Sequence, residues 1–227
     1  MKILIIDNNI HSEFWGSKEL CKLAKLHPKA TVYIRRAPEE DLPKDPAPYD
    51  RIIVSGSKTS AMSEEPWIEK LSLFIKRAVD LKKPYLGVCY GHQMLARALG
   101  GKDCVRKAAQ PEIGWVQVKL TGSSPLLEGL PKEFYTYSSH YDEVCTLPKG
   151  MKNLAHSDIC AVQACQLESS PVFGIQFHPE RTLEDANRSY QQLIKTSNPP
   201  VFLNYARGVK LYNSKIGETL FKNFLSL

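Results

Sequence analysis

The stretch YLGVCYGHQMLARALGG, residues 85–101, joins an apolar segment directly to one with helical periodicity. Residues 85–88 are short and apolar, as expected of a strand buried on both faces of a parallel sheet. The helical part carries its apolar residues on one face, at Met94, Leu95, Ala98 and Leu99. Gly100 and Gly101 then end the predicted helix. A buried strand that runs into a helix, with Cys89 at the junction, indicates an α/β fold.

The residues before this stretch alternate in the same way. Short β-branched runs predict three strands, at residues 2–7, 31–36 and 51–56. Helical spacing predicts helices at residues 20–26 and 66–78, and the proline-rich residues 37–50 predict a surface loop. The alternation predicts a doubly wound, mostly parallel sheet flanked by helices, with functional sites at the carboxyl ends of its strands.

The pattern changes after residue 102 to strand-like pieces joined by turns. These pieces lie at residues 114–120, 133–139, 160–167 and 172–177. They predict a small added antiparallel or mixed section within the same domain. The remainder predicts a helix at 182–195, a loop through SNPP, and a last helix near 214–225. We therefore expect a single domain over residues 1–227.

Length and composition exclude several classes of protein. The chain has 227 residues, 43% of them hydrophobic, which is enough for a substantial core and unlike a disordered protein. The opening MKILIIDNN has only four consecutive apolar residues, and no later run reaches membrane-spanning length. We therefore expect a soluble cytoplasmic protein without a membrane partner. The net charge of +6 comes from interspersed charges and predicts no nucleic-acid partner.

The six cysteines contain no C-x-x-C pair, so we interpret them as reduced thiols. Cys89 is distinguished by its position, because the unpaired amides and positive end of the following helix lower a thiol pKa and favour the thiolate. Gly87 and Gly91 flank it at a spacing that permits a sharp turn, as in the G-x-S-x-G elbow of serine hydrolases. The alternative is a buried apolar cysteine, and this position alone does not decide between the two.

A second predicted strand end, FGIQFHPE at residues 173–180, carries a histidine and a glutamate. A nucleophilic cysteine needs a base, and the base needs a third group to fix its tautomer. His178 and Glu180 lie two positions apart on a segment expected to be extended, so their side chains should point the same way. The alternative is a capped strand end without catalytic function.

A third strand end, VSGSKTS at residues 54–60, is rich in small residues. Small residues let backbone amides approach a ligand, which suits an oxyanion hole, and the alternative is an ordinary turn. The spacing of a phosphate-binding loop is absent from the sequence. His140 is a further candidate because it lies near Asp142. No pair of such residues has zinc-ligand spacing, so we predict no metal site.

Taken together, these three strand ends resemble the class I glutamine amidotransferase family, which has a Cys-His-Glu triad. The resemblance rests on GVCYGHQ at residues 87–93, GIQFHPE at 174–180, and the SG that follows the third strand. It implies a flavodoxin-like fold without a cofactor and a family core of about residues 1–185. Residues 186–227 are longer than this core requires and are predicted to be a C-terminal helical extension. SSHYDEV and PEIGW are most similar to the amidotransferase half of GMP synthetase and its free-standing relatives.

The resemblance implies that L-glutamine is hydrolysed to glutamate and ammonia through a γ-glutamyl thioester. Cys89 would be the nucleophile, His178 the base, and Glu180 the group that orients it. The other implied roles are oxyanion donation by the backbone of Tyr90, Gly56 and Ser57, and glutamine binding by Gln93, Ser139 and His140.

Three departures from the family pattern leave other functions open. Ser57 replaces the glycine whose amide usually completes the oxyanion hole, and Tyr141 replaces a glycine of GMP synthetase. Nothing in the chain resembles the S-G-G-x-D-S loop of an ATP pyrophosphatase domain, so ammonia would pass to a separate acceptor or synthetase subunit. The alternatives are a γ-glutamyl peptidase that uses the same triad, or a regulatory or binding subunit with weak catalysis.

Overall fold

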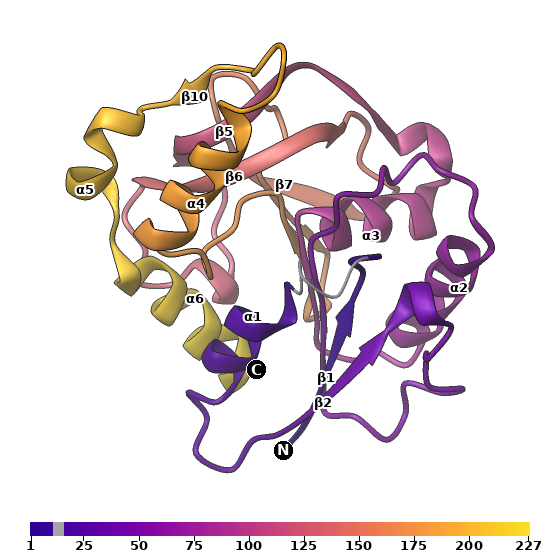
Figure 1. Ribbon diagram of the computed structural model, residues 1–227. Coiled ribbons are helices and arrows are strands. Elements are labelled where there is room, and N and C mark those ends of the chain that lie inside the picture. The colour runs from indigo at the N-terminus through magenta and orange to yellow at the C-terminus, as the bar shows by residue number, and fades with distance from the viewer. Residues whose placement is uncertain (11–15) are drawn as a thin grey trace.

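The computed structural model describes residues 1–10 and 16–227, which form a ten-stranded sheet with helices on both faces (Figure 1). The strand order is β10-β5-β7-β8-β9-β4-β3-β1-β2, and β6 pairs with β5. Five neighbouring strands form the parallel half of the sheet: β1 (Lys2–Asp7), β2 (Thr31–Arg36), β3 (Arg51–Val54), β4 (Tyr85–Val88) and β9 (Val172–Ile175). The predicted α/β fold with a sheet flanked by helices is confirmed.

The other half of the sheet is mostly antiparallel, as the change of pattern after residue 102 predicted. It contains β5 (Val105–Leu120), β6 (Glu133–Val144), β7 (Met151–His156) and β8 (Ala164–Leu167). The register of β5 against β6 shifts between Lys107 and Glu112. The strand β7 was not predicted, because its sequence MKNLAH has little apolar alternation and pairs with residues far along the chain.

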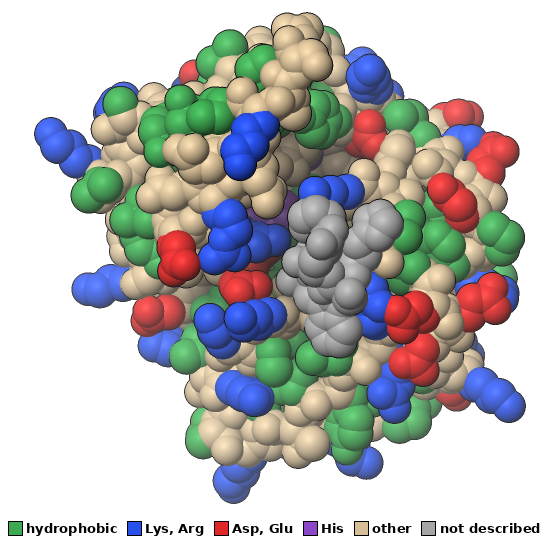
Figure 2. Space-filling view, in the orientation of Figure 1, with side chains coloured by type: hydrophobic (Ala, Val, Ile, Leu, Met, Phe, Trp, Pro, Cys, Tyr) green, Lys and Arg blue, Asp and Glu red, His purple; other side chains and the backbone are tan. Residues whose placement is uncertain are grey.

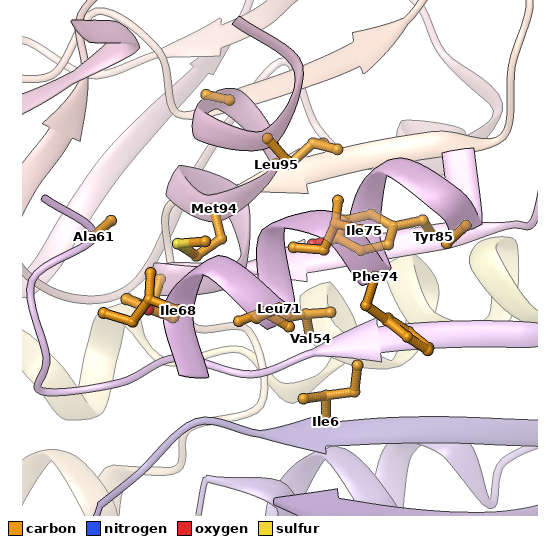
Figure 3. Close-up of a cluster of buried hydrophobic side chains, with 14 of the residues drawn as sticks. Ile6, Val54, Ala61, Ile68, Leu71, Phe74, Ile75, Tyr85, Met94 and Leu95 are labelled. Atoms are coloured by element: carbon orange, nitrogen blue, oxygen red, sulfur yellow. The ribbon is translucent and has the colours of Figure 1, made fainter. Parts of the chain in front are cut away.

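The helices α2 (Pro66–Asp80) and α3 (Tyr90–Gly100) cover one face of the parallel half. Pro66 occupies the first position of α2, where the missing amide costs nothing. The buried side of α2 then packs against strand residues such as Ile6 and Val54 (Figure 3). The four apolar positions that predicted this helix are all fully buried: Ile68, Leu71, Ile75 and Ala78.

The opposite face is covered by α1 (Ser17–Ala24) and α6 (Ser214–Ser226). Leu220, Phe221 and Phe224 of α6 are fully buried, so the end of the chain completes the core. Before α6 come α4 (Leu183–Leu193), α5 (Gly208–Leu211) and the short strand β10 (Phe202–Leu203), which pairs with β5. The two predicted helices of this extension are confirmed as α4 and α6, and the loop predicted between them also adds the two-residue strand β10 to the edge of the sheet.

The start of α3 packs very closely against β3. A Cβ atom on Gly91 would lie 2.2 Å from the carbonyl oxygen of Val54, and a Cβ on Gly87 would lie 2.3 Å from the carbonyl oxygen of Gly91. Only glycine permits these two approaches, which explains the flanking glycines of the strand-to-helix junction. No helix in the described ranges, 1–10 and 16–227, is both long enough and apolar enough to cross a membrane.

Replacing Gly91 by alanine is expected to lower the free energy of unfolding by about 1–3 kcal/mol, because the new methyl group would overlap the Val54 carbonyl. Denaturant unfolding followed by circular dichroism measures the change. Gly122→Ala is the control, since its nearest neighbour is the end of the Leu154 side chain at 3.1 Å. Equal midpoints for the two variants would contradict this packing.

Candidate active site

Cys89 lies at the junction of β4 and α3 with an unusual backbone conformation. Its φ of 51° and ψ of −103° are rare for a residue other than glycine. Its amide donates to the carbonyl oxygen of Ile175 at 2.8 Å, and its own carbonyl accepts from the amides of His92 and Gln93 at 3.0 Å each. These bonds hold the strained residue between the strand and the first turn of the helix.

The pair of His178 and Glu180 follows β9. Nδ1 of His178 lies 2.7 Å from Oε1 of Glu180, and both side chains are buried. The predicted extended segment is wrong in detail, because β9 ends at Ile175 and residues 178–181 form a turn closed by the Arg181 amide on the His178 carbonyl at 3.2 Å. Pro179 fits the second position of such a turn, where its fixed φ is favourable. The pair forms nonetheless, across the turn.

The imidazole of His178 lies beside Cys89 and the backbone of Gly56. A Cβ on Gly56 would lie 2.8 Å from Cε1 of His178 and 3.6 Å from Cβ of Cys89, so the three residues are in close contact. Burial lowers the pKa of His178, but the Glu180 carboxylate and the Cys89 sulfur outweigh it and raise the pKa to about 10. This arrangement favours an imidazolium between a carboxylate and a sulfur.

The same coupling acts on Glu180. Burial alone would raise the pKa of this carboxyl group, but the neighbouring His178 and, more weakly, Arg181 hold it below its usual range. A carboxylate in this position fixes the imidazole by its Nδ1 hydrogen and leaves Nε2 for a reacting group. The sulfur of Cys89 lies 3.8 Å from the carbonyl oxygen of Ser139, so β6 also borders the sulfur.

The turn after β3 is held by its own hydroxyl groups. Ser57 Oγ donates to the carbonyl oxygen of Asn8 at 2.8 Å and accepts from the Thr59 amide at 3.0 Å. Its side chain therefore bonds within the loops after β1 and β3 and does not fill the space at Cys89. Gly56 and Ser57 both line the cavity that contains Cys89. Tyr90 begins α3, so its amide is among the first amides of the helix, which have no partner within the helix.

The three predicted glutamine contacts, Gln93, Ser139 and His140, line the same cavity. Gln93 Nε2 donates to the carbonyl oxygen of Asp142 at 2.7 Å and to Gln176 Oε1 at 3.1 Å. The ring of His140 is bonded to Glu112 and to the Asp142 carbonyl, so its side chain supports the wall. The cavity lining thus contains every sequence-predicted site residue except Tyr90, which directly follows Cys89 in the chain.

The cavity has a volume of about 1270 Å³ and continues from Cys89 to the helices α1 and α4. Figure 2 shows Lys and Arg side chains gathered around this hollow. Lys18, Lys22 and Lys25, which follow one side of α1, line it and form no salt bridge with a described residue. Tyr141, which is half exposed, also lines it.

Sequence reasoning missed one buried cluster next to the site. Glu112, His140 and Cys160 place ligand-type atoms within 4.8 Å of one another, although they are far apart in the chain. The search for paired zinc-ligand spacing could not find such a group. The sequence did offer one signal for this cluster. Glu112 is a charged residue next to the apolar positions of PEIGWVQV, which could have indicated a buried polar group.

Comparison with known proteins identifies the family of this chain. The family model of class-I glutamine amidotransferases matches residues 14–194. The chain is 35% identical over 181 residues to the glutamine-hydrolyzing GMP synthase subunit of Methanocaldococcus jannaschii, covering 78% of this chain and 87% of that protein. It is 39% identical over 132 residues to the protein of the same name from Sulfurisphaera tokodaii, covering 58% of this chain and 68% of that one.

Solved structures share the fold. The structure of a glutamine amidotransferase from Methylobacillus flagellatus superposes with a TM-score of 0.82 at 22% identity and covers 99% of this chain and 94% of that one. This likeness confirms the flavodoxin-like arrangement. The matched family model covers more than half of the chain and includes every strand from β2 to β9. The chain therefore belongs to the class I glutamine amidotransferase family and is an enzyme of that class.

Proposed function

We propose that the protein hydrolyses the side-chain amide of L-glutamine with Cys89, His178 and Glu180 as its triad. The observation that carries the proposal is the His178–Glu180 pair, at 2.7 Å, placed beside a cysteine on a strained strand-to-helix turn. A cysteine, a base and an orienting carboxylate in this order are the components of nucleophilic acyl transfer.

The proposed reaction has two steps. The Cys89 thiolate attacks the amide carbon, the C–N bond breaks, and the His178 imidazolium gives its proton to the leaving nitrogen, which departs as ammonia. Water then attacks the γ-glutamyl thioester while His178 accepts a proton, and the C–S bond breaks to release glutamate. The amides of Tyr90 and of the Gly56–Ser57 turn are the proposed donors to the oxyanion in both steps.

The names of the similar proteins support a proposal for the fate of the ammonia. The similar proteins are named as subunits of a glutamine-hydrolyzing GMP synthase. We therefore propose that this chain, as one domain over residues 1–227, passes ammonia to a separate synthetase subunit. The alternative of a binding subunit with weak catalysis predicted a serine side chain in the oxyanion position. The bonds of Ser57 to Asn8 and Thr59 do not favour that alternative.

A γ-glutamyl peptidase remains the second candidate because of the cavity. Its volume of about 1270 Å³ exceeds the usual 300–1,000 Å³ of small-molecule sites, and glutamine is a small ligand. The three lysines of α1 would suit an anionic group attached to the amide nitrogen of a γ-glutamyl conjugate.

Replacing Cys89 by alanine is expected to reduce glutaminase turnover by about 10³-fold or more, because no thioester can form. Ammonia release and labelling by 6-diazo-5-oxo-L-norleucine, an electrophilic glutamine analogue, measure the effect. Cys145→Ser is the control, since this partly exposed thiol lies at the end of β6 and not in the cavity lining. Normal turnover by Cys89→Ala would refute the proposed nucleophile.

The protonation of His178 should depend on Cys89. With a pKa raised to about 10 from 6.5, His178 stabilises the fold fully below pH 6.5, and this contribution is lost as the pH rises toward 10. In Cys89→Ala the pKa of His178 should fall, because the sulfur is one of the groups that raise it. Nitrogen NMR of the imidazole from pH 5 to 10 measures both titrations. Coincident titration curves would show that the sulfur does not act on the ring.

Charge reversal on α1 separates the two candidate substrates. The double variant Lys18→Glu/Lys22→Glu should lower kcat/KM for a γ-glutamyl dipeptide with an acidic second residue by about 10-fold, and leave glutamine within about 2-fold. Lys29→Glu/Lys44→Glu is the matched control, because both lysines are exposed and neither lines the cavity. Equal losses in both double variants, or no loss, would remove the argument for the peptidase.

A further inference from the structure

Glu112 is a buried carboxylate in β5 that accepts hydrogen bonds from two side chains and lies within hydrogen-bond distance of a third. Its Oε2 accepts from Gln163 Nε2 at 2.6 Å and lies 2.9 Å from His140 Nε2. Its Oε1 accepts from the hydroxyl of Ser157. The residue has no solvent exposure, so these donors replace its hydration. Two neutral donors, one on each oxygen, suit an ionised carboxylate, which is acceptor-only.

Both ring nitrogens of His140 face acceptors. Nε2 faces the Glu112 carboxylate, and Nδ1 lies 3.0 Å from the carbonyl oxygen of Asp142. A neutral imidazole donates through one nitrogen only, so one of these contacts would then join two acceptors. An imidazolium donates through both nitrogens and satisfies both contacts. Because His140 is buried, such a cation needs the Glu112 carboxylate beside it.

The other titratable groups around the ring do not compete for this role. His92 of α3 stays neutral, because burial and then the nearby His140 lower its pKa to about 3. Burial raises the pKa of the Cys160 thiol to about 12, so this neighbour is uncharged as well. Gln163 and Ser157 are neutral donors to Glu112. Two other carboxylates lie nearby, but Glu143 is paired with Arg106 and the Asp142 carboxylate is bonded to Ser60. The carboxylate within hydrogen-bond distance of the His140 ring is that of Glu112.

The carbonyl of Asp142 connects this pair to the cavity. It is the acceptor facing His140 Nδ1, and it also accepts from Gln93 Nε2 at 2.7 Å. The Asp142 carboxylate in turn accepts from Ser60 Oγ at 2.5 Å, which joins the wall to the loop after β3. The carbonyl oxygen of Ser139, three residues before Asp142, lies 3.8 Å from the Cys89 sulfur. One short backbone segment thus positions Gln93 and bounds the sulfur.

We propose that Glu112 is a positioning residue for substrate binding: its carboxylate keeps His140 doubly protonated and thereby fixes the 139–142 backbone and Gln93 against the cavity. Glu112 touches neither Cys89 nor the cavity and acts through His140. The consequence for substrate rests on the proposed function, since the ligand assumed at this wall is L-glutamine. The charged state of the His140–Glu112 pair does not rest on the proposed function.

Replacing Glu112 by glutamine is the test, read by nitrogen NMR of the His140 ring and by steady-state kinetics. The wild type should show His140 with both nitrogens protonated at pH 7, and Glu112→Gln should show a neutral ring. The KM for glutamine should rise about 10-fold or more while kcat stays within about 3-fold, because the wall loses a charge-assisted bond and the triad is untouched.

Glu143→Gln is the matched control. Glu143 is also buried, and its carboxylate accepts from Arg106 at 2.8 Å across the same two strands, but neither residue lines the cavity. It should leave KM and the His140 spectrum unchanged. A neutral His140 in the wild type, an unchanged KM in Glu112→Gln, or an equal rise in Glu143→Gln would overturn the proposal.

A double variant and a readout that does not depend on activity complete the test. Should Glu112→Gln not fold, the double variant Glu112→Gln/His140→Gln buries no unpaired charge and is expected to fold with the same raised KM. A wild-type KM in that variant overturns the proposal. A wild-type protein that does not hydrolyse glutamine would refute the proposed function instead, and the His140 spectra of wild type and Glu112→Gln would still decide whether Glu112 holds the charge.

Discussion

The backbone at Cys89 must turn from strand to helix within one residue, and the rest of the site depends on that turn. A φ of 51° at a residue with a side chain costs of the order of 1–3 kcal/mol. The surrounding contacts offset this cost. They are the hydrogen bond from the Cys89 amide to Ile175, the burial of β4 and the close packing of Gly91 on Val54. The strained conformation therefore persists because β3, β4, β9 and α3 cannot relax separately.

The two halves of the sheet supply different parts of the site. The parallel half provides the ends of β3, β4 and β9, and so the backbone turn, the cysteine and the histidine. The antiparallel half provides the wall along β6, and it also holds the histidine, whose amide donates to the Tyr137 carbonyl at 2.8 Å. His178 is thus anchored from both halves. The added antiparallel section therefore helps to position the residues of the candidate site.

The limits of sequence reasoning follow from distance along the chain. The strand-to-helix junction at Cys89 was predictable because its signals, a buried run and an apolar stripe, lie within seventeen residues. The meeting of Cys89 with His178 was expected only because parallel strands end at one edge and because a family resemblance joined the motifs. The turn at Pro179 was missed because FGIQFHPE contains apolar alternation up to the histidine, while β9 stops at Ile175. The role of Glu112 was out of reach, since its three hydrogen-bonding partners come from β6 and from the residues between β7 and β8.

Each of two buried histidine–glutamate pairs has its histidine in the cavity lining, and burial gives the two pairs a common physical basis. In each, a carboxylate lies within 3 Å of a ring nitrogen, at 2.7 Å for His178 and 2.9 Å for His140. A buried imidazolium is unstable without such a partner, so each glutamate determines whether its histidine can carry charge. The difference lies in the second nitrogen. Nε2 of His178 is left for the sulfur and, in the proposed reaction, for transferred protons. Nδ1 of His140 instead faces the backbone carbonyl of Asp142. In the proposed roles, the same chemical pair therefore serves proton transfer in one place and the shape of the wall in the other.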